Sequence, residues 1–128
     1  MLRLHGGERQ KKHAATVATF AYQSRRRGFR VEVIPQVEGP AEPDAAVFDG
    51  DGKPVYVEVE TGRRRDRKWQ NMADLQGFVA VCAGNEAAQA ALVEEIKSLG
   101  IPGRATCLDV LIQDKEGTGK LWAQEWEK

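Results

Sequence analysis

The feature that most constrains this chain is a tight turn between two strand-like segments. Residues 49–54 read Asp-Gly-Asp-Gly-Lys-Pro, and a largely apolar segment lies on each side of them, at 44–48 and at 55–60. Each Asp-Gly pair offers a residue that takes positive φ at little cost, which a tight hairpin requires. The sequence therefore predicts that the two segments are antiparallel neighbours in a sheet, with Asp49 and Asp51 as residues of the turn.

The rest of the chain alternates between helical and strand patterns. Apolar residues at spacings of three and four, with Gly28 as a stop, predict a first helix, and alternation from Phe29 to Ile34 predicts a strand. The apolar segment 78–83, an Ala-rich helix with Asn85 as its N-cap and a last apolar segment form a β-α-β unit with parallel strands. The predicted order is helix 8–27, strands 29–34, 44–48 and 55–60, helix 63–75, strand 78–83, helix 86–99 and strand 105–112.

A single domain is expected from the length of 128 residues. Hydrophobic residues make up 41% and charged residues 30%, which is the composition of a globular domain rather than of a disordered or fibrous chain. The element order predicts an α/β fold with a central mixed sheet of about five strands flanked by helices. Its core covers residues 8–112, and residues 113–128 form a short extension that packs as a turn against the body.

The cysteines and the start of the chain bear on its compartment. Cys82 and Cys107 lie in apolar segments and match neither a zinc spacing nor a disulfide framework, so they read as buried thiols in a reducing compartment. The N-terminus has no apolar region after its basic residues, which argues against a secretory signal. No apolar segment approaches the roughly 18 residues of a membrane span. We expect a cytoplasmic protein with no membrane partner.

Charge is segregated along the chain although the net charge is zero. Residues 1–30 hold eight Lys or Arg and one acid, residues 31–62 hold eight acids and one Lys, and residues 63–68 hold five bases and Asp66. Such blocks are often ordinary solvated surface. They can also form a basic surface around an acidic pocket, an arrangement that suits a polyanion held at a metal ion.

Three carboxylates are expected to converge at the open end of the predicted hairpin. Alternation puts Glu58 and Glu60 on one face of their strand, and the short hairpin brings Asp44 opposite them. Three like charges at short range are costly unless a cation neutralises them, and hard divalent ions such as Mg²⁺ or Mn²⁺ prefer oxygen ligands. The alternative is that these carboxylates simply face solvent.

A basic run follows directly and opens the next predicted helix. Basic side chains at a helix N-terminus oppose the helix dipole, so stability does not explain this run. Lys68, and Gln70 after it, could reach back to the carboxylates, while the arginines could contact phosphates in a salt-sensitive way that does not depend on base sequence. The candidate nucleic-acid-binding residues are Arg63, Arg64, Arg65, Arg67 and Lys68.

Three further features are open to two interpretations each. His13 could face the site, or it could be a surface or packing residue. Arg25, Arg26 and Arg27 could extend the basic surface, or they could stabilise the C-terminal end of their helix. Trp69 is expected in the core, with base stacking as the alternative.

A family resemblance appears at this point. The dipeptide Pro-Asp at 43–44 and the sequence Val-Glu-Val-Glu at 57–60, in this order of elements, resemble the PD-(D/E)XK nuclease superfamily, also called the restriction endonuclease-like fold. The resemblance covers residues from 8 to 112. Within it, KKHAATVATF, GFRVEV, EPDAAVFDGDGKPVYVEVETG and RK are similar to nuclease-like domains of plasmid replication-relaxation and mobilisation proteins. Glu8 would match the acidic residue that this superfamily often carries in its first helix.

The resemblance implies roles for individual residues. Asp44 and Glu58 would bind the metal, with the backbone carbonyl of Val59 as a third ligand. Glu60 stands where the family usually has a Lys that orients or activates the attacking water. Lys68 would then supply that amine from the next helix, and Glu60 would be a further metal ligand or a base.

The main hypothesis is a metal-dependent DNA endonuclease that nicks DNA or cleaves particular DNA structures, with Asp44, Glu58, Glu60 and Lys68 as catalytic residues and Mg²⁺ or Mn²⁺ as cofactor. RNA stays open as a substrate. The alternative is an inactive domain of the same fold that binds nucleic acid or assembles with a partner, which is expected if Lys68 does not reach the site. A third hypothesis is an unrelated α/β protein whose acidic strand has no catalytic role. Because this length leaves no room for a recognition module, we expect a homodimer or a part of a larger replication or mobilisation protein.

Overall fold

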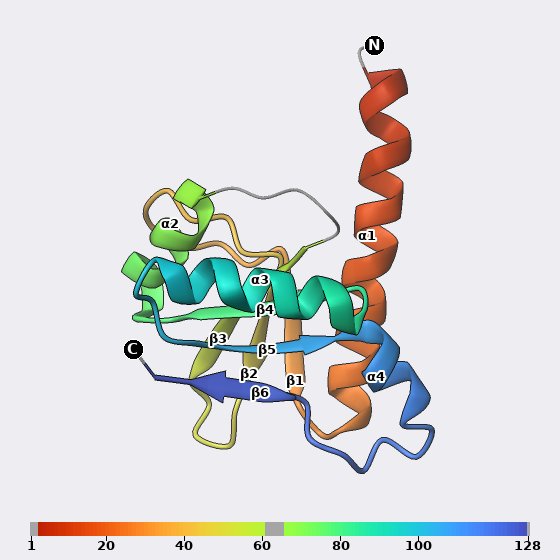
Figure 1. Cartoon of the computed structure of the whole chain (residues 1–128). Helices are drawn as coiled ribbons and strands as arrows, with labels where there is room; N and C mark the ends of the chain where they lie inside the picture. The colour runs from red at the N-terminus through yellow and green to blue at the C-terminus, as the bar shows by residue number, and fades with distance from the viewer. Residues whose placement is uncertain (1–2, 61–65, 128) are drawn as a thin grey trace.

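The described residues form one mixed sheet of six strands with helices on both faces (Figure 1). The structure is a computed structural model that describes residues 3–60 and 66–127, with side chains from residues 11 and 67 onward in these two segments. Its elements are α1 (Arg3–Arg26), β1 (Arg30–Val33), β2 (Ala45–Phe48), β3 (Pro54–Val59), α2 (Asp66–Gln76), β4 (Val79–Ala83), α3 (Glu86–Ser98), β5 (Gly103–Cys107), α4 (Leu108–Gln113) and β6 (Gln124–Trp126). The α/β class and the mixed sheet are confirmed, with one strand more than predicted.

The sheet keeps the strands in chain order, from β1 at one edge to β6 at the other. The three central strands β3, β4 and β5 run parallel, and the outer pairs β1–β2, β2–β3 and β5–β6 run antiparallel. The predicted hairpin is therefore β2–β3, and the predicted parallel unit is β4–α3–β5. Both are confirmed.

The turn of the hairpin forms for the reason given by its sequence. The Asp49 carboxylate accepts hydrogen bonds from the amides of Asp51 and Lys53, at 3.0 and 3.1 Å. Gly52 takes a φ of 81°, which a side chain would disfavour. Asp49 thus belongs to the turn, as predicted.

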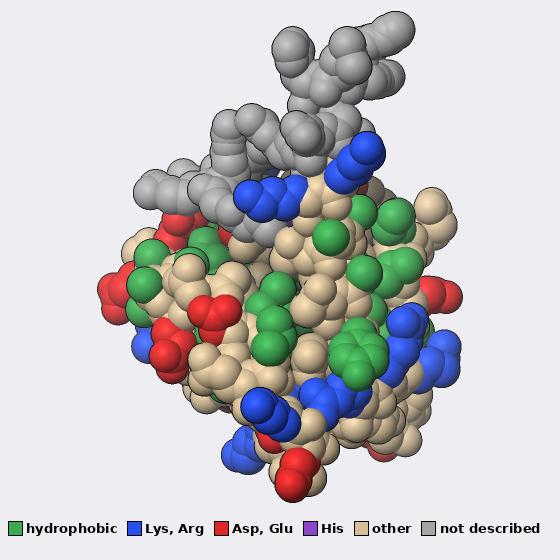
Figure 2. All heavy atoms as spheres, turned by 90° about the vertical axis from the view of Figure 1, so that its right-hand side faces the viewer, with side chains coloured by type: hydrophobic (Ala, Val, Ile, Leu, Met, Phe, Trp, Pro, Cys, Tyr) green, Lys and Arg blue, Asp and Glu red, His purple; other side chains and the backbone are tan. Residues whose placement is uncertain are grey.

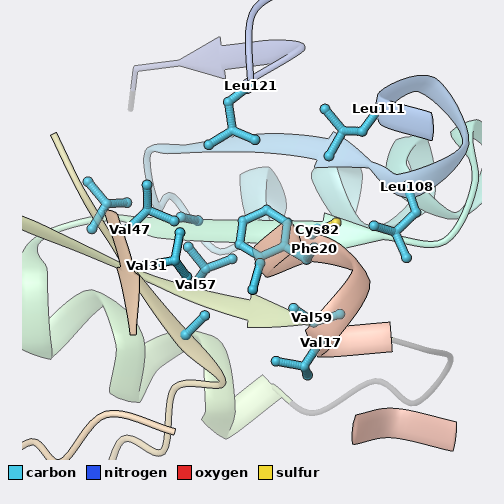
Figure 3. Close-up of a cluster of buried hydrophobic side chains, with 14 residues drawn as sticks. Val17, Phe20, Val31, Val47, Val57, Val59, Cys82, Leu108, Leu111 and Leu121 are labelled. Carbon is cyan, nitrogen blue, oxygen red and sulfur yellow. The ribbon is translucent and has the colours of Figure 1, made fainter. Parts of the chain in front are cut away.

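One face of the sheet is covered by α1 and α4. Figure 3 shows Phe20 of α1 in the middle of this apolar cluster, between the strands and residues from the end of the chain. Burial of such a continuous apolar layer is the main force that holds α1 to the sheet. The labelled members of the cluster are Val17, Phe20, Val31, Val47, Val57, Val59, Cys82, Leu108, Leu111 and Leu121.

The other face is covered by α2 and α3. Trp69 and Met72 of α2 and Ile96 of α3 are buried in a second apolar cluster over β4 and β5. The Trp69 indole is fully buried and its Nε1–H donates to Glu95 at 2.5 Å. Trp69 is therefore a core residue, as expected, and base stacking is excluded for it. The same packing fixes where α2 lies over the sheet.

The predicted strand at 105–112 is wrong beyond residue 107. β5 ends at Cys107, and the chain turns directly into α4. Leu108 and Leu111 are both buried in the α1 cluster. Their spacing of three places them on one face of a helix, whereas a strand would point them to opposite faces. A short apolar segment does not distinguish these two structures by pattern alone.

The C-terminal extension forms a strand instead of the predicted turn. β6 pairs with β5, with Trp126 opposite Gly103. The Trp126 indole Nε1–H donates to the carbonyl of Ile101 at 2.9 Å. The edge of the sheet at β5 supplies the backbone partners that make these few residues extended, and no local pattern in the sequence indicates this.

Gly103→Ala should destabilise the fold by about 2 kcal/mol, because overpacking a tight site typically costs this much. A Cβ at residue 103 would lie 2.4 Å from the backbone oxygen of Val79 and 2.7 Å from the Trp126 ring. Urea unfolding followed by tryptophan fluorescence measures the effect. Gly84→Ala is the matched control, since a Cβ there meets no atom within 4 Å. Equal stability of the two variants would contradict the close approach of Val79 and Trp126 to residue 103.

Candidate active site

The hairpin register brings Asp44 beside Glu58. Ala45 pairs with Val57, and the amide of Asp44 donates to the Val57 carbonyl at 2.9 Å, so Asp44 lies across from Glu58 at the end of the ladder. Residues that face each other across an antiparallel pair project from the same face of the sheet. The predicted juxtaposition of these two carboxylates is therefore present.

The Asp44 carboxylate is held from two sides. Its Oδ2 accepts a hydrogen bond of 2.8 Å from the backbone N–H of Val59, at the end of β3. Its Oδ1 lies 2.9 Å from Nε2 of His13, which reaches it from α1. The side chain keeps 17% of its surface exposed, so it is fixed in place and still open to a ligand. Of the two interpretations for His13, the structure selects the one in which it faces the site.

Glu58 is a buried carboxylate whose two oxygens differ in their contacts. Its side chain is 4% exposed, and its Oε2 lies 2.6 Å from the Lys68 ammonium. Its other oxygen, Oε1, is buried and has no hydrogen-bond partner among the residues that the structure describes. Burial, reinforced by the negative charge of Asp44, raises the pKa of Glu58 to about 8, although Lys68 opposes this shift.

Lys68 connects α2 to the acidic strand. Its Nζ lies 2.6 Å from Glu58 and 3.7 Å from Glu60. Burial lowers the pKa of the amine, but the hydrogen bond and charge of Glu58 outweigh that effect, and the pKa of Lys68 rises above its ordinary value. The amine from the next helix thus reaches the carboxylates, which is the condition that separates the main hypothesis from its inactive alternative.

Glu60 lies one step farther from Asp44 on the same strand face. It is 6% exposed, and its amide donates to the Cys82 carbonyl of β4 at 2.9 Å. Its carboxylate lies 3.7 Å from the Lys68 amine. Glu60 is not among the residues that line the pocket at Asp44. The geometry favours a part in holding Lys68 over a direct contact with a ligand of Asp44.

A pocket of about 370 Å³ opens over these groups. Arg67 lines it with an exposed side chain, so one predicted phosphate-binding residue is present at its rim. Gln70 does not line it, and its amide donates to Asp74 instead, so the predicted reach of Gln70 toward the carboxylates is wrong. Asn71 also lines the pocket. The sequence gives no signal for it, because its part in the pocket depends on how α2 packs on the sheet.

Several predicted residues lie outside the described part of the chain. They are Arg63, Arg64 and Arg65, together with the side chain of Glu8, whose backbone is in α1. The carbonyl of Val59 as a metal ligand stays a prediction. The contact that Val59 does make with the site is the hydrogen bond from its amide to Asp44.

The arginines at the end of α1 have a structural use. Arg27 donates to the Leu111 carbonyl and pairs with Asp114 at 2.9 Å, and Arg26 donates to the carbonyl of Lys115. These bonds tie the end of α1 to α4 and the segment after it, away from the pocket. Figure 2 shows basic side chains gathered near this lower end of the face that carries α1. The helix-end interpretation is therefore favoured over an extended binding surface.

The chemistry of the two carboxylates fits a hard divalent ion. Among the residues the structure describes, no group of three or more His, Cys, Asp or Glu side chains is arranged to hold a metal ion. Two carboxylates are nevertheless enough for Mg²⁺, which usually keeps several waters and takes further oxygens from a substrate phosphate. The unpartnered Oε1 of Glu58 beside Asp44 is a group that such an ion would satisfy.

Comparison with known proteins adds no relative to these observations. No family model, no curated protein and no solved structure matches the chain. The helices in the described part of the chain include none that is long and apolar enough to cross a membrane. The function must therefore be argued from the chemistry of this site.

Proposed function

We propose that the chain is a nuclease domain that hydrolyses phosphodiester bonds of DNA with the help of Mg²⁺ or Mn²⁺. The observation that carries this proposal is the meeting of Asp44, Glu58 and Lys68 in one pocket, where one buried oxygen of Glu58 has no partner within the described part of the chain. A buried carboxylate oxygen without a hydrogen bond lowers the stability of the fold. Its presence in a pocket therefore indicates that the oxygen binds a ligand.

Asp44 and Glu58 would hold the ion, with the carbonyl of Val59 as the predicted third ligand. When bound, the ion would supply Lewis-acid polarisation of the phosphate and a lower pKa for an attacking water. The protein contributes the placement. Val59 and His13 fix the Asp44 carboxylate through its two oxygens, and burial fixes Glu58.

Lys68 would orient the attacking water or stabilise the charge that develops on the phosphate. Its ammonium carries three donors and no acceptor, and at 2.6 Å only one of them is directed to Glu58. The Lys68 side chain is 29% exposed and lines the pocket, so a phosphate oxygen bound there would lie close to it. The carboxylate of Glu60 lies 3.7 Å from the same amine and attracts it as well. Arg67 at the rim would bind a neighbouring phosphate as a sequence-independent anchor.

The test is the relaxation of supercoiled plasmid by the purified chain with Mg²⁺ or Mn²⁺, and its absence in EDTA. Lys68→Ala should slow nicking by about 10²- to 10³-fold, since positioned proton-transfer or charge-stabilising groups contribute on this order. Lys120→Ala removes an exposed lysine on the last loop and should leave the rate unchanged.

A double variant separates the role of the amine from its position. Glu60→Lys combined with Lys68→Ala returns the amine to the strand position that the PD-(D/E)XK pattern uses. We expect it to recover a measurable part of the rate that Lys68→Ala loses. If the unmodified chain binds DNA with a steep salt dependence but never cuts it with either metal, the inactive binding domain is the correct function.

A further inference from the structure

The pocket at the candidate active site has two walls of different chemistry. One wall is α2, which lines the pocket with the polar side chains of Arg67, Lys68 and Asn71. The other wall is formed by residues 40–42, here called the proline wall, which belong to the chain between β1 and β2. Figure 1 shows this part of the chain beside α2. A ligand in the pocket would therefore lie between a polar surface and a largely apolar one.

The proline wall is stiff and is anchored to the core. Pro40 is exposed, and its ring fixes the backbone φ angle. Ala41 is 6% exposed and belongs to the apolar cluster that contains Trp69 and Met72 of α2. A surface that is already ordered loses little conformational entropy when a ligand binds to it. The wall thus offers a preformed apolar surface against which a flat group can pack.

Asn71 is the polar group of α2 that has no structural use in the described part of the chain. It follows Lys68 by three residues and Arg67 by four, so the three side chains project from one face of the helix. Asn71 is half-buried, and its amide makes no hydrogen bond with a described residue, whereas the neighbouring Gln70 bonds to Asp74. An Asn side chain has two donors and one acceptor oxygen, which is the combination that pairs with the polar edge of a base.

The charges around the pocket suit one phosphate and not two. Three carboxylates line it, namely Glu42 and the two proposed metal ligands, together with the two cations of α2. A bound divalent ion would bring the positive charges to four, with His13 counted as neutral. One phosphodiester would then balance the charges, whereas a second would meet an excess of negative charge. The remaining space therefore favours a neutral group with polar edges, and the base is the neutral and planar part of a nucleotide.

The size of the pocket agrees with a single nucleotide. Its volume of about 370 Å³ lies in the range of about 300–1,000 Å³ that is usual for small-ligand sites. A base inside a duplex is paired and stacked, so it cannot enter such a pocket unless it leaves the stack. Leaving the stack costs least for a base that has no partner. The pocket therefore selects nucleic acids in which a nucleotide is already unpaired.

We propose that the pocket binds an unpaired nucleotide next to the scissile phosphate, with its base packed on Pro40 and hydrogen-bonded to Asn71. The substrate class is DNA that carries an unpaired nucleotide, such as a bulge or a single-stranded end. The proposal rests on the proposed function, because the carboxylates and Lys68 define where the phosphate lies. Asn71 is then a specificity-determining residue, which acts on the choice of substrate and not on the bond that breaks.

The test compares two fluorescein-labelled DNA duplexes by anisotropy, with Ca²⁺ in place of Mg²⁺ so that binding is measured apart from cleavage. One duplex is fully paired, and the other has the same sequence with one extra, bulged nucleotide. The chain should bind the bulged duplex about tenfold more tightly, and Asn71→Ala should remove most of this preference. Gln70→Ala is the matched control, because it removes the same amide from an adjacent position that does not line the pocket.

A second variant tests the opposite wall. Pro40→Ala removes an exposed apolar ring and should also weaken binding of the bulged duplex, with little change for the paired one. Because Pro40 is exposed and Asn71 makes no hydrogen bond with a described residue, both variants should melt at the temperature of the unmodified chain.

The outcomes separate this proposal from the nuclease activity. Equal affinity of the unmodified chain for the two duplexes overturns the proposal, even if the chain cuts plasmid. A preference for the bulge that is lost in Asn71→Ala supports it, even if no cleavage is found, in which case only the catalytic function fails. A preference that persists unchanged in both Asn71→Ala and Pro40→Ala also overturns it, because the unpaired nucleotide then binds elsewhere.

Discussion

Asp44→Asn should reduce plasmid nicking by about 10²- to 10³-fold, and Glu58→Gln should do the same. Each change removes one negative ligand while keeping the shape of the side chain, and loss of a single group that stabilises transition-state charge typically costs about 10²- to 10³-fold. The amide oxygen of the Asp44→Asn variant can still accept the hydrogen bond that Oδ2 of Asp44 accepts from the Val59 amide at 2.8 Å, so the change removes mainly the charge. The measurement is the initial rate of relaxation of supercoiled plasmid in Mg²⁺ and in Mn²⁺.

Glu94→Gln is the control for these two variants, because it removes an exposed carboxylate on α3 and should keep the full rate. Isothermal calorimetry should show weaker Mn²⁺ binding for Asp44→Asn and Glu58→Gln than for the control. Cleavage that persists at the control rate in both variants would rule out the proposed site. Loss of cleavage with unchanged metal affinity would leave the carboxylates with a role other than metal binding.

The free energy of unfolding should fall as pH rises from about 4.5 to about 8 in metal-free buffer. The pKa of Glu58 rises from 4.5 to about 8 on folding, mainly through burial and then through the charge of Asp44. In this window the folded protein keeps a proton that the unfolded chain has released, so the contribution of this proton to stability is full below pH 4.5 and is lost on the way to pH 8. A pKa difference of one between the folded and unfolded states corresponds to about 1.4 kcal/mol, so this single group contributes on the order of several kcal/mol. Lys68 also has a raised pKa, but its effect lies above the ordinary value of 10.5 and does not enter the window.

Urea unfolding across this pH range measures the effect, with Glu58→Gln as the diagnostic variant. Its amide does not ionise, so its stability should vary much less between about pH 5 and pH 8 and should exceed that of the unmodified chain at about pH 8. Mg²⁺ should stabilise the unmodified chain more at the upper end of this range than at the lower end, because the ion competes with the proton for Glu58. Stability that rises steadily over this window, or a Glu58→Gln variant with the same pH dependence, would show that the carboxylate is not held in the buried state described.

The proposed nuclease would carry out its chemistry in one pocket. Asp44, Glu58 and Lys68 meet there, and Arg67 lies at its rim. Stability alone does not explain this arrangement, because Oε1 of Glu58 is buried with no hydrogen-bond partner among the described residues.

The hairpin and the pairing of its carboxylates could be predicted because they depend on neighbours in sequence. Positive-φ residues in the turn and alternation in the strands determine which side chains face each other, whatever packs around them. The predicted strand at 105–112 is partly wrong because its structure depends on a distant neighbour. Its second half is helical since Leu108 and Leu111 bury against α1, which lies far away in the sequence.

By itself the sequence determined the α/β class, the parallel unit β4–α3–β5 and the face-to-face placement of Asp44 and Glu58, since each follows from local periodicity and turn chemistry. Only the tertiary structure decided that Lys68 reaches Glu58, that His13 reaches Asp44, and that residues 124–126 add a sixth strand. These contacts join elements through the packing of whole helices and strands, whose positions are set by burial of apolar surface from many residues at once. No short pattern in the chain carries that information.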